Sequence, residues 1–588
     1  MDNNNYFINF AKVILIFSYP KLRLGDSLEI MFWHSFGCEK LIQNTKKQME
    51  YNTLRDLFES STSKYKDNTA FTFIEGEGYS YAQLGDKTRE VAALLAEYGI
   101  KKEDKVGILS HNMPNWSVTF FSIVSFGRIA VPMLPDFSIN DIRHILKHSD
   151  SKALFVSSKL LSKVDDVALE RLSLVINIDT FEVIKGEKVV ETEIEPLVEA
   201  KEIKAEDLAI IIYTSGTTGG SKGVMLTHLN LLTNLAACQE LRPCYEYDTW
   251  LSLLPLSHTF ELCLVLILPL SAGGSVFYLQ KAPTPSILLS AFNKVRPTTI
   301  LSVPLIIEKI YKSAIQPQLT KSAVIRMMMK FPPTRKMLHR IASKKLYEKL
   351  GGNLTFFGIG GAKLDANVER FLLEGKFPYA IGYGLTETSP MLAGAATKMV
   401  KFRSTGPQVK GVTLKLIDQD PQTGIGEIVA KGNNIMIGYY KNPEATAAAF
   451  TEDGWFRTKD LGYFDKKGWL YIKGRVSNTI IGPSGENIYP EDIESVINSH
   501  ELVLESLVTE NKKGKLTAFV RFNQEKLDAF LNTTKFENLK KEILDYVNEK
   551  VNKFSRISDV EKQDGEFEKT ATMKIKRYLY NLKNPNKK

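Results

Sequence analysis

Apolar and polar residues follow two different periods along this chain from Tyr51 onward. Glu90 to Tyr98 has the spacing of an amphipathic helix, and the apolar run Val106 to Ser110 that follows is typical of a buried strand. Helices and short apolar strands of this kind keep alternating well past the middle of the chain. This alternation predicts layered α/β structure with largely buried sheets.

The pattern changes after about Lys410. The segments GVTLKLID, GEIVAKG and WLYIKGR indicate short strands separated by glycine and aspartate turns, which predicts a small β-rich, barrel-like subdomain. Past Arg475 a compact α+β pattern begins, with a helix expected around Leu539 to Val551. We therefore expect a large N-terminal α/β domain over residues 49–475 and a small, mobile C-terminal domain over residues 476–588.

The first 48 residues do not fit this pattern. Their apolar stretch from Tyr6 to Tyr19 is interrupted by Lys12, is too short to cross a bilayer and is followed by no small-residue cleavage site. We interpret residues 1–48 as an extension that precedes a true start near Met49. A membrane anchor is the less favoured alternative.

Composition narrows the class of protein. With 588 residues, 44% of them hydrophobic and 24% charged, the chain is too long for one ordinary core and is neither disordered nor collagen-like. The net charge of +9 favours anionic partners, but no zinc-finger spacing or RNA-binding signature points to nucleic acid. The four cysteines form no CxxC pair, so we expect structural thiols and a cytoplasmic location.

The strongest candidate for chemistry is a glycine-rich loop. The apolar strand Leu208 to Tyr213 runs directly into TSGTTGGSKG, residues 214–223. Glycines let backbone N–H groups approach phosphate oxygens, and the hydroxyls and Lys222 add donors and charge. We predict an ATP phosphate cradle, with an ordinary surface loop as the alternative. A Walker loop is excluded because Lys222 is followed by glycine rather than Ser or Thr.

This stretch, YTSGTTGGSKGVMLTH, resembles the signature of the adenylate-forming superfamily, which contains acyl-CoA synthetases, luciferases and peptide-synthetase adenylation domains. Further segments resemble the family's motifs in the family's order: LPLSHTFE (254–261), GIGGAKL (358–364), GYGLTETSP (382–390), GWFRTKDLGYFD (454–465), KGRVSNTIIGPSGENIYPEDIE (473–494) and TATMKIKR (570–577). The resemblance runs from about Met49 to the end of the chain. It implies an enzyme that uses ATP to convert a carboxylic acid into an acyl-adenylate and then passes the acyl group to a thiol.

The resemblance also assigns roles to single residues. It implies that ATP and AMP are bound by Thr214, Ser215, Gly216, Thr217, Thr218, Gly219, Lys222, Gly361, Ala362, Gly382, Tyr383, Gly384, Thr386, Asp460 and Arg475. Glu387 and Thr214 would hold Mg²⁺, Tyr383 would stack on adenine, and Asp460 would accept hydrogen bonds from the ribose. The alternative for Glu387, Asp460 and Arg475 is a solvated surface charge.

Three further residues are candidates for roles in catalysis, in the hinge and in the thiol tunnel, at the junction of the two expected domains. Lys574 resembles the catalytic lysine that swings in from the C-terminal domain and bridges the substrate carboxylate and the α-phosphate, although its spacing alone would suggest a solvated lysine. Ser477 occupies the hinge position, where relatives usually have Asp or Lys. His258 is either a packed core histidine or lines the junction of acyl pocket and thiol tunnel.

The substrate is indicated less directly. Met573 stands where ligases of shorter acids usually have Gly, which favours a long-chain fatty acid. The run Leu262 to Leu270 could wall a lipid pocket, although a buried core helix is the favoured explanation. Arg326 to Lys345 mixes bases with methionines, which suits a membrane surface, an acidic carrier protein or a plain solvated helix face. The acceptor stays open between CoA and acyl carrier protein.

Two other functions are alternatives to that of a long-chain fatty acid–CoA ligase. Met573 and the absence of an attached carrier-domain serine argue against an aryl or amino acid adenylating module. Lys574, Glu387 and Asp460 argue against a catalytically inactive nucleotide-binding regulator.

Overall fold

The predicted alternation of helices and buried strands is confirmed by the computed structural model, which describes residues 51–190, 196–197, 199–214, 221–281, 283–482, 486–532, 534–570 and 574–580. The helix expected at Glu90 to Tyr98 is the second half of α5 (Tyr81–Glu97), and the strand expected next is β3 (Lys105–Leu109). The extension of residues 1–48 lies outside the described residues.

The first large sheet carries the predicted phosphate loop. Its strands run in the order β18-β9-β8-β4-β3-β5-β6-β7. Their bounds are β18 (Gly438–Tyr439), β9 (Lys222–Thr227), β8 (Leu208–Thr214), β4 (Ile129–Met133), β3, β5 (Ser151–Val156), β6 (Leu174–Asn177) and β7 (Val183–Lys185). The central strands β8, β4, β3, β5 and β6 are parallel, and the pairs at both edges are antiparallel. Strand β4 is buried throughout, which is why this part of the sequence forms continuous apolar runs.

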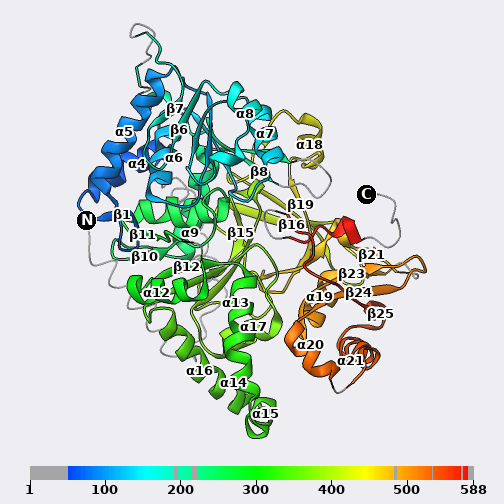
Figure 1. Ribbon diagram of the computed structural model, residues 1–588. Helices are drawn as coiled ribbons and strands as arrows, with labels where there is room; N and C mark the ends of the chain where they lie inside the picture. Colours follow the sequence, from blue (N-terminus) through cyan, green and yellow to red (C-terminus); the bar gives the residue numbers. More distant parts are fainter. Residues whose placement is uncertain are drawn as a thin grey trace, which may run out of the picture. The chain divides into compact units, whose positions relative to one another are not determined.

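The second large sheet has the order β15-β14-β13-β12-β10-β11-β1-β2. The strands are β15 (Met391–Gly394), β14 (Tyr379–Gly384), β13 (Phe356–Ile359), β12 (Thr299–Ser302), β10 (Thr249–Leu251), β11 (Ser275–Tyr278), β1 (Thr69–Phe73) and β2 (Gly78–Ser80). Helix α9 (His228–Leu241) contacts β9 of the first sheet and β15 of the second, so it joins the two layers. Figure 1 shows α9 between them.

The same part of the chain contains further helices. They are α4 (Leu54–Lys64), α6 (Pro114–Val124), α7 (Ile139–His148), α8 (Asp166–Arg171), α10 (Thr259–Glu261), the π-helix η4 (Leu262–Ile267), α11 (Leu268–Ala272), α12 (Pro285–Val295), α13 (Pro304–Ile310), α14 (Gln316–Thr320), α15 (Ala323–Lys330), α16 (Pro332–Lys349) and α17 (Ala366–Glu374). The run Leu262 to Leu270 is a buried helical segment, as favoured from the sequence. No helix among the described residues has the length and apolar character needed to span a membrane.

The β-rich segment after Lys410 is a four-stranded antiparallel sheet of β16 (Val412–Ile417), β17 (Gly426–Gly432), β19 (Phe456–Phe464) and β20 (Leu470–Arg475). The α+β segment that follows contains β21 (Ile480–Ile481), β22 (Asn487–Ile488), α19 (Pro490–Asn498), β23 (Val503–Glu510), β24 (Leu516–Phe522), α20 (Gln524–Leu531), α21 (Phe536–Asn548) and β25 (Asp559–Lys562). Leu539, Ile543 and Val547 of α21 are buried in its own core, as their spacing predicts.

Candidate active site

The described residues at the two ends of the phosphate-loop motif belong to neighbouring strands. Strands β8 and β9 are antiparallel, and Thr214 is paired with Lys222 across them. The predicted phosphate-binding residues Ser215, Gly216, Thr217, Thr218 and Gly219 lie outside the described residues. Helix α9 begins only after β9, capped by the side chain of Thr227. This strand-to-strand arrangement differs from a Walker loop, in which a helix follows the loop directly.

Tyr439 connects these strands to the candidate metal ligand. Strand β18 places Tyr439 next to β9, and the Lys222 Nζ lies 4.9 Å from the centre of the tyrosine ring. The Tyr439 hydroxyl donates a 2.9 Å hydrogen bond to Glu387 Oε1. Burial and the Glu387 charge raise the pKa of Tyr439, so it stays a protonated donor. Tyr439 could not be predicted as a site residue, because no local sequence pattern distinguishes it from a core aromatic residue.

Glu387 can take part in a shared magnesium site. It lies in the 3₁₀ turn Thr386–Thr388 after β14 and is partly exposed, whereas Thr386 is buried. Among the described residues, no group of three or more His, Cys, Asp or Glu side chains could hold a metal. A single carboxylate fits Mg²⁺ nevertheless, because this ion keeps several waters and takes other ligands from substrate phosphates.

Asp460 is held from two sides. It faces Arg475 across β19 and β20, and Arg475 Nε donates to its Oδ1 at 2.9 Å. The Tyr383 hydroxyl donates to Oδ2, also at 2.9 Å. Asp460 raises the pKa of Arg475, so the guanidinium stays charged. Each carboxylate oxygen keeps acceptor capacity for a further donor. The stacking of Tyr383 on adenine stays a prediction.

Lys574 is close enough to Arg475, Asp460 and Glu387 for their charges to affect its pKa. It directly precedes Ile575, which is paired with Lys569 in an isolated antiparallel bridge. The surrounding protein and the charge of Arg475 lower the pKa of Lys574, while Asp460 and Glu387 act in the opposite direction. Its side chain is still accessible to solvent. The lysine from the end of the sequence thus lies within electrostatic range of Glu387 and Asp460. Met573 lies outside the described residues.

Contacts from two lysines support this arrangement of the C-terminal segment. Lys363 forms an ion pair with Asp492 of α19. The Lys312 Nζ donates to the backbone carbonyls of Asn498 and Val503, at 2.9 and 3.0 Å. Both lysines belong to the large N-terminal part of the chain, and their three partners all follow the proposed hinge. Ionic and hydrogen-bond contacts of this type are common between domains of one chain.

In the LPLSHTFE segment, the last residue, Glu261, is hydrogen-bonded to the first residue, Leu254. Glu261 is fully buried; its Oε1 accepts hydrogen bonds from the Ser252 hydroxyl (2.7 Å) and from the backbone amides of Leu253 and Leu254 (3.1 and 3.3 Å). Its Oε2 has no partner, and burial raises its pKa to about 8. A protonated carboxyl therefore braces the loop that carries His258.

His258 is neutral at physiological pH. Its Nδ1 accepts a 3.2 Å hydrogen bond from the Phe260 amide, which leaves Nε2 to carry the proton. Burial, and then the nearby charge of Lys574, lower its pKa to about 4. The bond from the Phe260 amide fits the packed, hydrogen-bonded histidine expected from the sequence. That His258 lines the junction of acyl pocket and thiol tunnel stays a prediction.

Two glycines in the predicted nucleotide motifs occupy positions where a side chain would clash or would strain the backbone. A Cβ on Gly384 would lie 1.6 Å from the Pro390 carbonyl oxygen, and Gly361 has a positive φ of 87°. Gly361 and its neighbour Ala362 are exposed after β13, so a ligand could approach this backbone closely. Ser477 is exposed in the 3₁₀ turn Val476–Asn478, and its hinge role stays a prediction.

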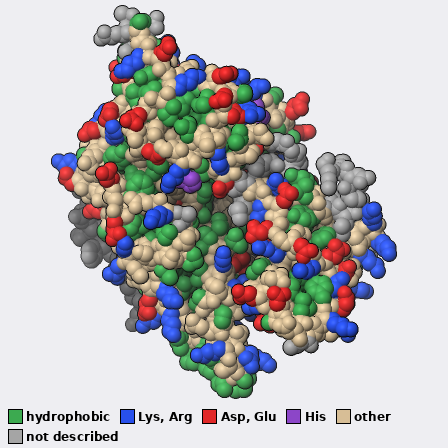
Figure 2. Space-filling model, viewed as in Figure 1, with side chains coloured by type: hydrophobic (Ala, Val, Ile, Leu, Met, Phe, Trp, Pro, Cys, Tyr) green, Lys and Arg blue, Asp and Glu red, His purple; other side chains and the backbone are tan. Residues whose placement is uncertain are grey.

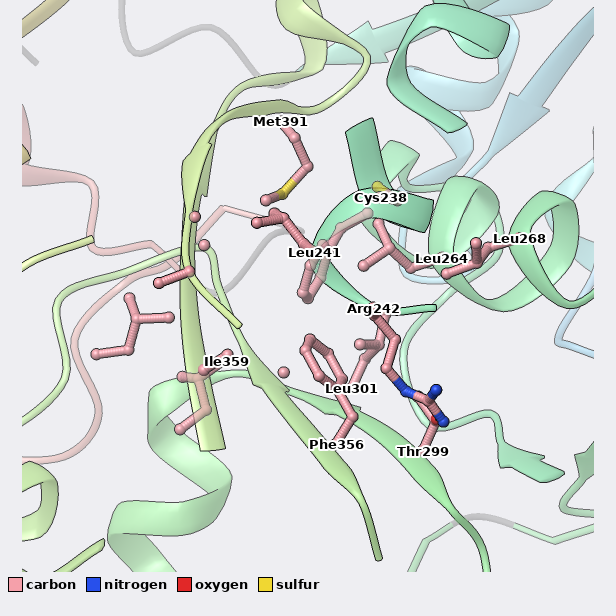
Figure 3. Close-up of a pocket in the computed structure, with 17 residues that line it drawn as sticks. Cys238, Leu241, Arg242, Leu264, Leu268, Thr299, Leu301, Phe356, Ile359 and Met391 are labelled. Atoms are coloured by element: carbon pink, nitrogen blue, oxygen red, sulfur yellow. The ribbon is translucent and has the colours of Figure 1, made fainter. Parts of the chain in front are cut away.

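An apolar pocket lies behind β14, next to Gly382 (Figure 3). Its lining includes Cys238, Leu241, Arg242, Phe260, Leu264, Leu268, Thr299, Leu301, Phe356, Gly358, Ile359, Ala380, Ile381, Gly382, Met391, Gly394 and Ala395. Leu241, Phe356 and Met391 converge on it from α9, β13 and β15. The one charged lining residue, Arg242, is paired with Asp248 at 2.8 Å. The run Leu262 to Leu270 thus contributes two wall residues as well as core.

The chain is similar to known proteins in family, sequence and fold. The profile described as AMP-binding enzyme matches residues 58–440, and that described as AMP-binding enzyme C-terminal domain matches residues 477–581. The chain is 29% identical over 497 residues to the long-chain-fatty-acid–CoA ligase heimdall of Drosophila melanogaster, covering 76% of this chain and 72% of the relative. It is 26% identical to a chloroplastic long-chain-fatty-acid–[acyl-carrier-protein] ligase of Arabidopsis thaliana, with 84% and 79% covered. ATP-bound MatB from Rhodopseudomonas palustris has a similar fold, with a TM-score of 0.72, 24% identity, and 91% and 99% covered.

Proposed function

Because this chain belongs to the AMP-binding enzyme family, we propose that it activates a long-chain fatty acid with ATP and transfers the acyl group to CoA. The products would be acyl-CoA, AMP and pyrophosphate. The observation that supports this proposal most is that Lys574 lies within electrostatic range of Glu387, Asp460 and Arg475, which belong to other segments of the sequence. The relatives named above, a CoA ligase and a carrier-protein ligase of long-chain acids, support the choice of substrate.

In the first half-reaction a carboxylate oxygen attacks the α-phosphorus of ATP, and the bond to pyrophosphate breaks. Two anions must approach one another, so positive charge has to be in place before the reaction. Lys574 supplies an ammonium group for the carboxylate and the α-phosphate. Lys222, on strand β9, supplies a second ammonium group for the ATP phosphates. Glu387 and the Thr214 hydroxyl would hold Mg²⁺, which would neutralise phosphate charge when bound.

The nucleoside would be held by the neighbouring groups. Asp460 has acceptor capacity left beside its bonds to Tyr383 and Arg475, as a ribose hydroxyl pair requires. The Tyr383 ring cannot turn freely, because its hydroxyl is hydrogen-bonded to Asp460. In the second half-reaction the thiol sulfur attacks the acyl carbon and AMP leaves. Neutral His258 is positioned to donate from Nε2 rather than to act as a base there.

We assign the apolar pocket to the acyl chain. Its lining is almost entirely apolar, and it reaches Gly382, the first residue of the GYGLTETSP motif. Its free volume is only about 30 Å³, so a long acyl chain with its carboxylate near Lys574 would require the lining side chains to move apart. The domain boundary at residue 476, the hinge at Ser477 and a cytoplasmic location belong to the same proposal.

The test measures the two half-reactions with a panel of acids. ATP–pyrophosphate exchange should be strongest with long-chain fatty acids, and weak with aryl and amino acids. Thioester formation is then measured with CoA and with acyl carrier protein in separate reactions. A thioester with the carrier protein and none with CoA would contradict the proposed acceptor and favour an acyl carrier protein ligase.

A further inference from the structure

Helix α15 carries an apolar face that the described protein does not cover. None of its eight residues is buried. Val324 and Met327 are 63% and 58% exposed, and Phe331, directly after the helix, is 58% exposed. A short helix normally owes its stability to burying such a face against the rest of the protein. The uncovered side chains therefore indicate an interaction surface.

Helix α16 extends this surface. Met337 and Ile341 are 47% and 51% exposed and lie four residues apart, so they share one side of the helix. The other side is buried through His339, Ala342, Ser343 and Leu346. The exposed residues are thus held on a well-anchored helix, while its inner side belongs to the core. We call Val324, Met327, Phe331, Met337 and Ile341 the outer apolar face.

The charges around this face have one sign. No Asp or Glu occurs between Glu308 and Glu348, whereas this stretch contains ten Lys and Arg residues. Five exposed cations flank the outer apolar face and form no ion pair with any described residue: Lys330, Lys336, Arg340, Lys344 and Lys345. Arg335 differs, because it is paired with Glu374. Figure 2 shows apolar side chains gathered over α15 with basic side chains beside them.

We infer that the outer apolar face and its five cations dock on an anionic lipid bilayer. Apolar side chains can enter the boundary between headgroups and acyl chains, while Lys and Arg contact lipid phosphates. Methionines and long basic side chains adapt to a fluid interface, whereas a folded acidic protein would be recognised mainly through the charges. The surface would bring the enzyme to the phase in which long-chain acids partition, although docking itself does not depend on the proposed substrate.

Vesicle flotation of the full chain without substrates tests this inference. Vesicles of phosphatidylcholine alone are compared with vesicles that also contain about one third phosphatidylglycerol. The protein should float with the anionic vesicles only, and less so as salt is raised. Because neither ATP nor acid is present, the outcome is independent of whether the proposed reaction is correct.

Matched variants separate the contribution of the cations to vesicle binding from that of the apolar side chains. Lys330→Glu with Lys344→Glu should lower partition into anionic vesicles at least tenfold, since each cation contributes about fivefold. Lys512→Glu with Lys513→Glu, the same charge change on an exposed turn of the C-terminal segment, should have a much smaller effect. Met327→Ser with Ile341→Ser should weaken partition at every salt concentration. All variants should keep the melting temperature of the wild type within a few degrees, which shows that they are folded.

Three outcomes would overturn the inference. They are no flotation of the wild type with anionic vesicles, equal losses in both charge-reversal pairs, and wild-type flotation of the Lys330→Glu, Lys344→Glu variant combined with lost transfer to acyl carrier protein. The last would show that the face recognises an acidic protein instead.

Discussion

The hydroxyl of Tyr439 donates a 2.9 Å hydrogen bond to the carboxylate of Glu387. The ring of the same tyrosine lies 4.9 Å from Lys222 Nζ. One side chain on β18 thus fixes both the candidate metal ligand and the lysine of β9. A cation over the face of a tyrosine is attracted electrostatically, so the three groups form a connected unit.

The variant Tyr439→Phe should separate these two contacts. The phenyl ring keeps the contact with Lys222, whereas Glu387 loses its hydrogen bond. We expect ATP–pyrophosphate exchange to fall about tenfold and to need more Mg²⁺, because a hydrogen bond to a charged group contributes roughly 1.5–3 kcal/mol. Tyr440→Phe is the matched control, since its hydroxyl contacts Asp150 at the surface. Equal effects of both substitutions would contradict the role of Tyr439.

Several elements could be predicted from the sequence because local pattern and burial agree there. Strand β3, helix α5 and helix α21 each follow the hydrophobic period that their burial requires. The carboxylates at positions 387 and 460 were identifiable only through motifs. Their spacing alone does not distinguish them from solvated acids.

Tyr439 and Glu261 were missed for a physical reason. A buried glutamate shows its role only through what surrounds it, and the partners of Glu261 are a hydroxyl and two amides of the same loop. Tyr439 depends on strand pairing with β9, a contact between segments far apart in sequence. No periodicity predicts such pairings.

Lys574→Ala should abolish the first half-reaction selectively. Loss of an ammonium at the reacting phosphate is expected to lower ATP–pyrophosphate exchange at least about a hundredfold. Thioester formation from acyl-adenylate supplied in solution should be largely retained. Lys576→Ala, which removes a surface lysine paired with Glu568, is the control. Wild-type thioester synthesis from acid and ATP by the Lys574 variant would show that this lysine is not catalytic.

The apolar pocket should set the length of the acid. Gly382 and Gly394 face one another across β14 and β15, and a Cβ on Gly394 would lie 2.8 Å from Leu241 Cδ1 and 2.9 Å from Met391 Cε. Gly394→Val should therefore narrow the pocket and lower exchange with long-chain acids about tenfold or more, with short acids less affected. Met391→Ala should widen it and act in the opposite direction. A uniform loss for all acids would argue that the chain lies elsewhere.

Glu261 should make stability depend on pH. Burial raises its pKa to about 8, so the folded protein keeps the proton while the unfolded chain releases it near pH 4.5. Stability from this group is fully present below pH 4.5 and is lost as pH rises through 8, by about 1.4 kcal/mol per unit. Glu261→Gln should remove this contribution. Denaturant titrations between pH 5 and 8 should show a weaker alkaline decline for the variant, and identical slopes would contradict the assignment.

The ion pair of Lys363 with Asp492 should favour the arrangement in which Lys574 faces the carboxylates, because it joins α19 to the large N-terminal part. Lys363→Ala should lower ATP–pyrophosphate exchange about threefold, the effect expected for a partly exposed pair. Thioester formation from supplied acyl-adenylate should not fall, since we expect that step to use a different position of the C-terminal segment. Lys398→Ala, an exposed lysine outside these contacts, should change neither rate. If Lys363→Ala slowed both half-reactions equally, the pair would support folding in general rather than one arrangement of the two parts.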